Sequence, residues 1–141
     1  MPGAIASAYL GLAVIYGRLG WVEQDVEAHE NALKYAEKST VTEELGLFQE
    51  WLADSYFKAK QFQLALEYYF QSLATYERFE SIESQIKTHG KIALTYWRMG
   101  IDEKLKEYAD RAAFLINKLQ DQEQKEALVI YIRFLFDAQG R

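Results

Sequence analysis

The chain contains no cysteine and a single proline, Pro2, among its 141 residues. The absence of cysteine excludes disulfides and thiolate chemistry, although it does not identify a compartment. The shortage of proline, together with abundant Ala, Leu, Glu, Lys and Gln, favours an all-helical protein. No run of alternating β-branched residues closed by a turn pair predicts a strand.

An excess of positive charge is also missing, because 16 Lys and Arg stand against 21 Asp and Glu and give a net charge of -5. This balance disfavours a protein that binds the phosphate backbone of nucleic acids. The apolar stretch 4–17 is too short to span a bilayer, and no Lys or Arg precedes it as in a signal peptide. We therefore expect a soluble, cytoplasmic protein without nucleic-acid or membrane partners.

Catalytic and metal-binding patterns are absent as well. No pair of histidines has a zinc-ligand spacing, no glycine-rich loop could hold a phosphate, and no serine lies in a nucleophile motif. We expect His29 to pack in a core and His89 to begin an inner helix, where it is partly solvated. Glu43 and Glu44 fit a helix N-terminus. The sequence predicts neither an enzyme nor a cofactor or metal site.

What the chain does have is a period of 40 residues. Tyr16, Tyr56 and Tyr96 follow one another at this step. Each follows a large–small pair, and a second set of pairs keeps the same step: Leu12-Ala13, Leu52-Ala53, Ile92-Ala93, then Ala32-Leu33, Ser72-Leu73, Ala112-Ala113. A fixed period of this length indicates stacked, similar units, and such arrays present an extended surface to partners.

Breaks in the pattern predict seven helices, near 4–17, 24–38, 43–59, 62–79, 82–99, 103–119 and 121–139. Gly20 suits a left-handed helix end. Hydroxyls at 39–42, Ser81 and Asp102 are expected to cap the following helices. We expect one domain, 1–141, with repeats at about 4–40, 41–80 and 81–120 and a terminal helix at about 121–139.

Each unit reads as a large apolar residue, Ala, two others, Tyr, three others and Gly, before a second helix with Ala-Leu near its middle. This order resembles the tetratricopeptide repeat, whose signature is Trp, Leu-Gly, Tyr, Gly, Ala, aromatic, Ala. The matching residues are Tyr9, Leu12, Ala13, Tyr16, Gly20, Val22, His29, Ala32; Leu52, Ala53, Tyr56, Phe62, Ala65, Tyr69, Ser72; and Ile92, Ala93, Tyr96, Gly100, Ala109, Ala112. The last helix matches through Ile132, Phe136 and Gly140. The resemblance implies a right-handed α-solenoid of three helical hairpins plus a seventh helix.

Several positions depart from the family pattern. Lys60 replaces a turn glycine, Asp25 and Leu105 replace small residues, and Arg133 stands where a small residue lets helices approach. The period is 40 rather than the family's usual 34. Such long repeats are similar to those of kinesin light chains, polarity adaptors and bacterial peptide-sensing regulators, which bind peptides in a groove.

In this family the first helix of each hairpin lines the inner surface. The resemblance implies a groove formed by Arg18, Trp51, Asp54, Phe57, Lys58, Lys87, Lys91, Trp97 and Arg98. Its aromatic residues would anchor a partner, and its basic residues would meet acidic groups. Purely structural roles stay open for both kinds of residue, because basic side chains stabilise helix C-termini and aromatic side chains commonly pack between units. The family's carboxylate-clamp positions hold Leu10, Val14, Glu50, Asp54, Gly90 and Leu94, so we do not expect chaperone-tail binding.

The first and last helices are apolar on nearly every side, whereas a solenoid normally ends in a polar face. The chain is a piece of a longer array, or it forms a homodimer through an end, or its last helix folds back into the groove. The first two are favoured, because a wide apolar surface marks an interaction site.

The main functional prediction is a protein–protein interaction scaffold or adaptor that binds a peptide or partner segment, with acidic segments among the candidates. The alternative is a ligand- or peptide-sensing regulatory domain of a larger regulator. An RNA-binding repeat would need a basic surface and a 35-residue period, and the sequence has neither.

Overall fold

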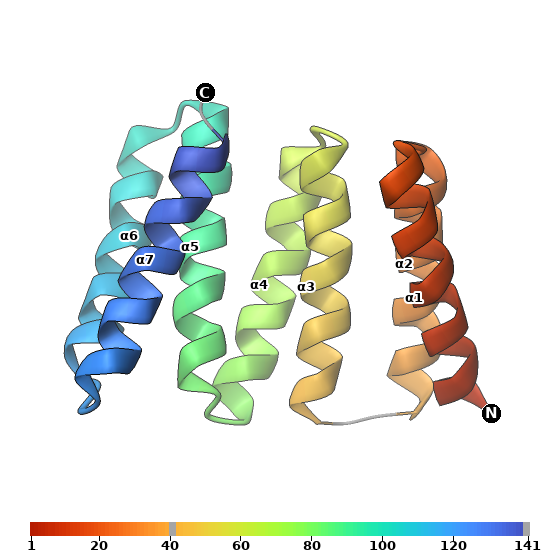
Figure 1. Ribbon diagram of the computed structural model, residues 1–141, viewed down its shortest axis with the longest axis horizontal. Coiled ribbons are helices and arrows are strands. Elements are labelled where there is room, and N and C mark those ends of the chain that lie inside the picture. The colour runs from red at the N-terminus through yellow and green to blue at the C-terminus, as the bar shows by residue number, and fades with distance from the viewer. Residues whose placement is uncertain (40–41, 140–141) are drawn as a thin grey trace. The chain divides into compact units, whose positions relative to one another are not determined.

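The computed structural model describes residues 1–39 and 42–139, and within them the chain forms seven α-helices and no strand (Figure 1). The helices are α1 (Pro2–Leu19), α2 (Val22–Ser39), α3 (Glu43–Lys58), α4 (Phe62–Arg78), α5 (Ile82–Met99), α6 (Asp102–Asn117) and α7 (Gln122–Gln139). The expected all-helical class is confirmed. Among the described helices, none combines the length and hydropathy that a membrane crossing needs.

The chain divides into two compact units, one ending at Thr75 and the other beginning at Tyr76. The first unit holds α1, α2, α3 and most of α4, and the second holds the end of α4 with α5, α6 and α7. The sequence predicted one domain over 1–141. Helical hairpins make most of their contacts with elements adjacent in sequence, so contacts gather locally. The solenoid arrangement of the three hairpins stays a prediction.

In the first unit, α1 packs against α2 and α2 packs against α3. Ala13 and Ala53 are 1% and 0% exposed, as the expectation of small residues at helix contacts requires. A larger side chain at either position would hold the helices apart. The 40-residue period therefore places its alanines inside the packing.

Tyr56 is buried between helices of the first unit. Its ring stacks on that of Tyr68 in α4 with centroids 5.6 Å apart, and its hydroxyl donates to Oε1 of Glu30 in α2 at 3.1 Å. Burial raises the pKa of Tyr56, and Glu30 raises it further, so the hydroxyl stays a donor. The equivalent Tyr16 and Tyr96 are only half-buried. Tyr56 is therefore more deeply buried than the tyrosines 40 residues before and after it.

The left-handed turn expected at Gly20 is confirmed, with φ of 73°, and Gly100 repeats it at 76°. Lys60 takes the same conformation at 61°. Its amide and the next one donate to the carbonyls of Phe57 and Tyr56 at 3.0 and 2.9 Å, which satisfies the end of α3. The turn thus survives the loss of glycine at a cost of about 1–2 kcal/mol in backbone strain.

The N-terminal caps follow the predictions in part. Thr42 caps α3 by accepting from the Glu44 amide at 3.2 Å, whereas residues 40 and 41 of the expected cap segment lie outside the described residues. The prediction that Asp102 caps α6 is wrong. Ile101 occupies the cap position, and Asp102 is the first helical residue, where its charge meets the helix dipole. Ser81 precedes α5 but makes no side-chain capping bond.

In the second unit, α5 packs against α6, and α7 packs mainly against α5. The core comprises Ile86, Ala112, Ile116 and Leu128, with Leu115, Leu119 and Ile132 against it. Ile132 Cγ1 lies 3.1 Å from the point where a side chain on Gly90 would begin, so glycine allows α7 to approach α5. Arg133 stands at the repeat position of the buried alanines but is exposed.

Candidate interaction surfaces

The two aromatic residues predicted to anchor a partner on α3 are partly packed within the first unit. Trp51 is half-buried and meets the Phe48 ring edge-on at 5.5 Å, and Phe57 is half-buried and meets the Phe62 ring in the same way at 5.3 Å. Each ring therefore has a fixed position and keeps part of its surface exposed. This arrangement suits an anchor that loses little freedom when a partner binds.

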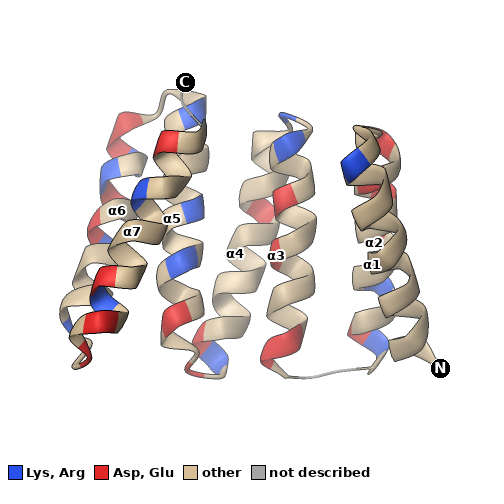
Figure 2. Ribbon diagram, viewed as in Figure 1, with Lys and Arg blue, Asp and Glu red and all other residues tan. Residues whose placement is uncertain are grey.

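The charged residues predicted for the same surface lie on α1 and α3. Asp54 accepts a hydrogen bond from the hydroxyl of Tyr69 in α4. Lys58 is exposed, and its Nζ lies 3.9 Å from the point where a side chain on Gly17 would begin. Arg18 follows Gly17 and is also exposed. Figure 2 shows basic residues near the ends of α1 and α3.

In the second unit, α7 covers part of the surface that the sequence predicted to be free. Lys87 pairs with Glu83 at 3.3 Å, and its Nζ lies 5.1 Å from the ring centroid of Tyr131 in α7. The Trp97 ring lies 5.1 Å from that of Phe136, also in α7. Lys87 and Trp97 therefore already contact α7 of the same chain.

Part of the apolar side of α7 is buried against α5 and α6. Within the second unit, the last helix lies on the α5 face that carries Lys87, Gly90 and Trp97. Leu128 is 2% exposed in this contact, which gives the apolar side of α7 a place to be buried. The remaining predicted residues of this unit, Lys91 and Arg98, are half-buried.

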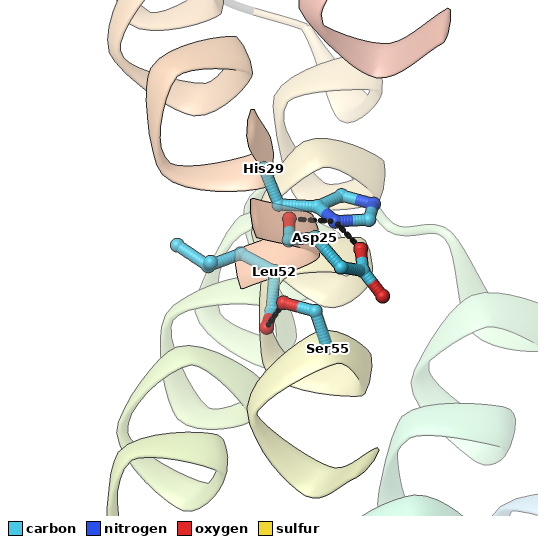
Figure 3. Close-up of polar contacts among 4 residues, drawn as sticks. All are labelled: Asp25, His29, Leu52 and Ser55. Atoms are coloured by element: carbon cyan, nitrogen blue, oxygen red, sulfur yellow. Dashed lines mark hydrogen bonds and ion pairs between the residues drawn. The ribbon is translucent and has the colours of Figure 1, made fainter. Parts of the chain in front are cut away.

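A polar cluster that the sequence did not predict lies at the start of α2 (Figure 3). Asp25 is 4% exposed, and His29 Nδ1 lies 2.8 Å from its Oδ1 and 3.1 Å from its carbonyl oxygen. Both oxygens are acceptors, so Nδ1 must carry a hydrogen. The hydrogen bond goes to the carbonyl oxygen, and Oδ1 has no hydrogen-bond partner among the described residues.

Gly17 makes room for this buried carboxylate. Asp25 Oδ2 lies 3.3 Å, and Lys58 Nζ 3.9 Å, from the point where a Gly17 side chain would begin. The sequence identified Asp25 as a departure from the family pattern and expected His29 in a core. The signal for their pairing was the four-residue spacing of an acid and a histidine on one helix.

His89 differs from its prediction, because it lies within α5 and is only 6% exposed rather than partly solvated. Its ring centroid lies 5.9 Å from that of Tyr108, and its Nδ1 has no hydrogen-bond partner among the described residues. Burial lowers the pKa of His89 to about 4, and the Arg111 charge adds to this effect. The imidazole is therefore neutral at pH 7.

The first helix presents an uncovered apolar face. Ile5, Leu12, Ile15 and Leu19 are exposed at 38%, 42%, 54% and 55%, and Ala8 is exposed between them. Their spacing of three and four residues places them along one side of α1. Arg18 is the sole charged residue of this helix, so most of α1 carries no charge in Figure 2.

No family model matches the chain, and no curated protein matches it. A solved structure that does match is the crystal structure of BtubC (BKLC) from P. vanneervenii, with a TM-score of 0.78 and 18% sequence identity. The match covers 98% of this chain and 57% of that chain. At this identity the likeness concerns the fold alone.

Proposed function

We propose that the protein is a protein–protein interaction module, a scaffold or adaptor that binds a peptide or partner segment on the first helices of its hairpins. The observation that carries this proposal is the surface of α3. Trp51, Asp54 and Phe57–Lys58 follow at three- and four-residue spacing on one face of the helix, with the two rings half-exposed. Buried aromatic anchors beside charged groups are typical of the residues that dominate binding energy.

Local charge favours an acidic segment as the occupant. Lys58 is exposed at the end of α3 and Arg18 at the end of α1, while Asp54 is engaged by the Tyr69 hydroxyl. An acidic side chain would meet the Lys58 cation on α3, and an apolar side chain would cover Phe57. Because these charges are exposed, the contribution of the ion pairs should fall as salt rises.

Peptide selection from a random phage-displayed library tests this proposal. Enriched synthetic peptides should bind the wild type, and Phe57→Ala and Lys58→Glu should each weaken binding by about tenfold, as loss of one interface anchor commonly does. Titration calorimetry gives the affinities. Lys106→Glu is the matched control, since Lys106 is 78% exposed on α6 of the other unit and should not affect binding. Enriched peptides that bind both surface variants with wild-type affinity would contradict the proposal.

We propose in addition that the exposed apolar face of α1 pairs with a second copy of the chain. A three–four spacing of apolar residues is the pattern that buries a seam between two helices. A twofold pair would place the same face of both copies in contact. The proposal is motivated by four large side chains, each more than a third exposed, on one helix.

Light scattering after size-exclusion chromatography should then show a dimer that Ile15→Glu with Leu19→Glu converts to a monomer. The stability of the fold should change little, because both side chains are more than half exposed. Ile130→Glu with Phe134→Glu is the counterpart on α7, where these residues are 63% and 66% exposed, and should leave the dimer intact. A wild-type monomer at high concentration, or a dimer broken only by the α7 variant, contradicts this assignment.

A pocket of about 520 Å³ in the second unit, with His89 in its lining, favours a second candidate function, a ligand-sensing regulatory domain. A buried polar group that lacks a partner commonly marks a place where something binds.

A further inference from the structure

Two repeats of this chain differ in the partner of a polar side chain on the first helix of the hairpin. In the first unit, the hydroxyl of Thr75 on α4 donates to Oε1 of Gln49 on α3 at 2.7 Å. The residues 40 positions later are His89 on α5 and Leu115 on α6. A polar side chain, His89, thus stands where Gln49 does, but Leu115, which has no hydroxyl, stands where Thr75 does.

The loss of this hydroxyl explains the unpaired imidazole. His89 is 6% exposed, and its Nδ1 finds no hydrogen-bond partner among the described residues. Leu115 packs against the apolar core of the second unit and cannot donate or accept. Leaving such a group buried and unsatisfied is unfavourable, because it loses its hydrogen bonds to water without gaining new ones.

Beside this imidazole the second unit contains a cavity of about 520 Å³. Its lining comprises Glu77, Gln85, His89, Asp110, Arg111, Phe114 and Leu115. The volume lies within the range of about 300–1,000 Å³ that is typical of small-molecule sites. Arg111 and Phe114 are exposed side chains, so they can change rotamer on a fast timescale and admit a ligand.

The lining also indicates the chemistry of the occupant. A cation would meet the Arg111 guanidinium and an anion would meet the carboxylates of Glu77 and Asp110, so a neutral group is favoured. A hydroxyl can donate to or accept from Nδ1 in either tautomer of the imidazole. Phe114 and Leu115 favour an aromatic body for the rest of the ligand.

We propose that this cavity binds a phenol. The phenol hydroxyl would form a hydrogen bond with His89, as the Thr75 hydroxyl does with Gln49. The phenol is either a free small molecule or the tyrosine side chain of a partner. This site is separate from the peptide-binding surface on α3. The low pKa of His89 agrees with the proposal, because a neutral imidazole can exchange one hydrogen bond with a neutral hydroxyl.

Titration of the intact chain by NMR with p-cresol and with toluene tests the proposal directly. The two probes differ by one hydroxyl. We expect p-cresol to bind about tenfold more tightly than toluene, as one well-placed hydrogen bond allows. The tripeptides Ala-Tyr-Ala and Ala-Phe-Ala form a second pair. Preference for the tyrosine peptide identifies a partner's side chain as the source, and preference confined to p-cresol identifies a free phenol.

Two variants link the preference to His89. Leu115→Thr restores the arrangement seen at Gln49 and Thr75. The introduced hydroxyl should form a hydrogen bond with the His89 imidazole and so abolish the preference for p-cresol. His89→Leu should abolish it as well, with the fold of each variant checked by its amide spectrum. Equal binding of p-cresol and toluene by the wild type overturns the proposal, and so does a preference that persists in folded Leu115→Thr. Either result leaves the peptide-binding proposal for α3 intact.

Discussion

Replacing Tyr56 by alanine is expected to lower the free energy of unfolding by about 3–5 kcal/mol, the range found for large aromatic residues removed from protein interiors. Tyr56 is 7% exposed, stacks on Tyr68 and donates to Glu30. Its removal would therefore leave a void among α2, α3 and α4 and a carboxylate without its donor. For a domain of marginal stability, this is a large share of the total.

Urea denaturation followed by circular dichroism measures this loss. Tyr56→Phe keeps the ring and should lose only about 1 kcal/mol with the hydrogen bond. Tyr16→Ala is a control at the equivalent repeat position, where the ring is half-buried, and it should be clearly less destabilising. A similar loss for Tyr16→Ala and Tyr56→Ala would show that burial does not determine the effect.

Acidification from pH 7 to pH 4 is expected to remove about 3 kcal/mol of stability through His89 alone. The pKa of His89 is about 4 in the folded chain because the ring is buried, with Arg111 contributing, whereas its ordinary value is 6.5. The contribution is therefore fully present above pH 6.5. It is lost as pH falls toward 4, because His89 binds a proton in the unfolded chain at pH values where it stays neutral in the folded chain. Glu77 and Asp110 also line the cavity, so their titration must be separated from that of His89.

Comparison with His89→Gln makes this separation, because all other titrating groups are common to both proteins. Gln is the residue that the preceding repeat carries at this position, Gln49. The difference in unfolding free energy between wild type and variant should change by about 3 kcal/mol between pH 7 and pH 4. A difference that is constant over this range would mean that His89 titrates normally in the folded chain.

The elements that the sequence predicted well are those determined by local chemistry and by the period. Gly20 ends α1 in the left-handed conformation, Thr42 caps α3, and Ala13 and Ala53 are buried. Each of these follows from steric or hydrogen-bonding needs that the residue itself reveals. The Asp102 prediction failed because the helix begins one residue earlier than the capping pattern indicated, a shift that local sequence seldom decides.

Features that depend on distant residues were harder to predict. The burial of His89 is determined by the packing of α6 and the end of α4 around it, and nothing in the residues beside it signals this. The packing of α7 on α5 depends on the close approach of Ile132 to Gly90, and these residues are 42 positions apart in the sequence. For the candidate site, the sequence placed Trp51, Asp54 and Phe57 on one helix face. It could not show that each also contacts a neighbour within the first unit.

The central claim, that the surface of α3 binds a peptide, is tested most directly by mapping amide chemical shifts when a selected peptide is added to the labelled chain. We predict that the largest shifts fall on Trp51, Asp54, Phe57 and Lys58, with Arg18 affected as well. Shifts confined to the pocket of the first unit that Glu37, Lys38 and Gln71 line would contradict the claim even if the peptide binds tightly.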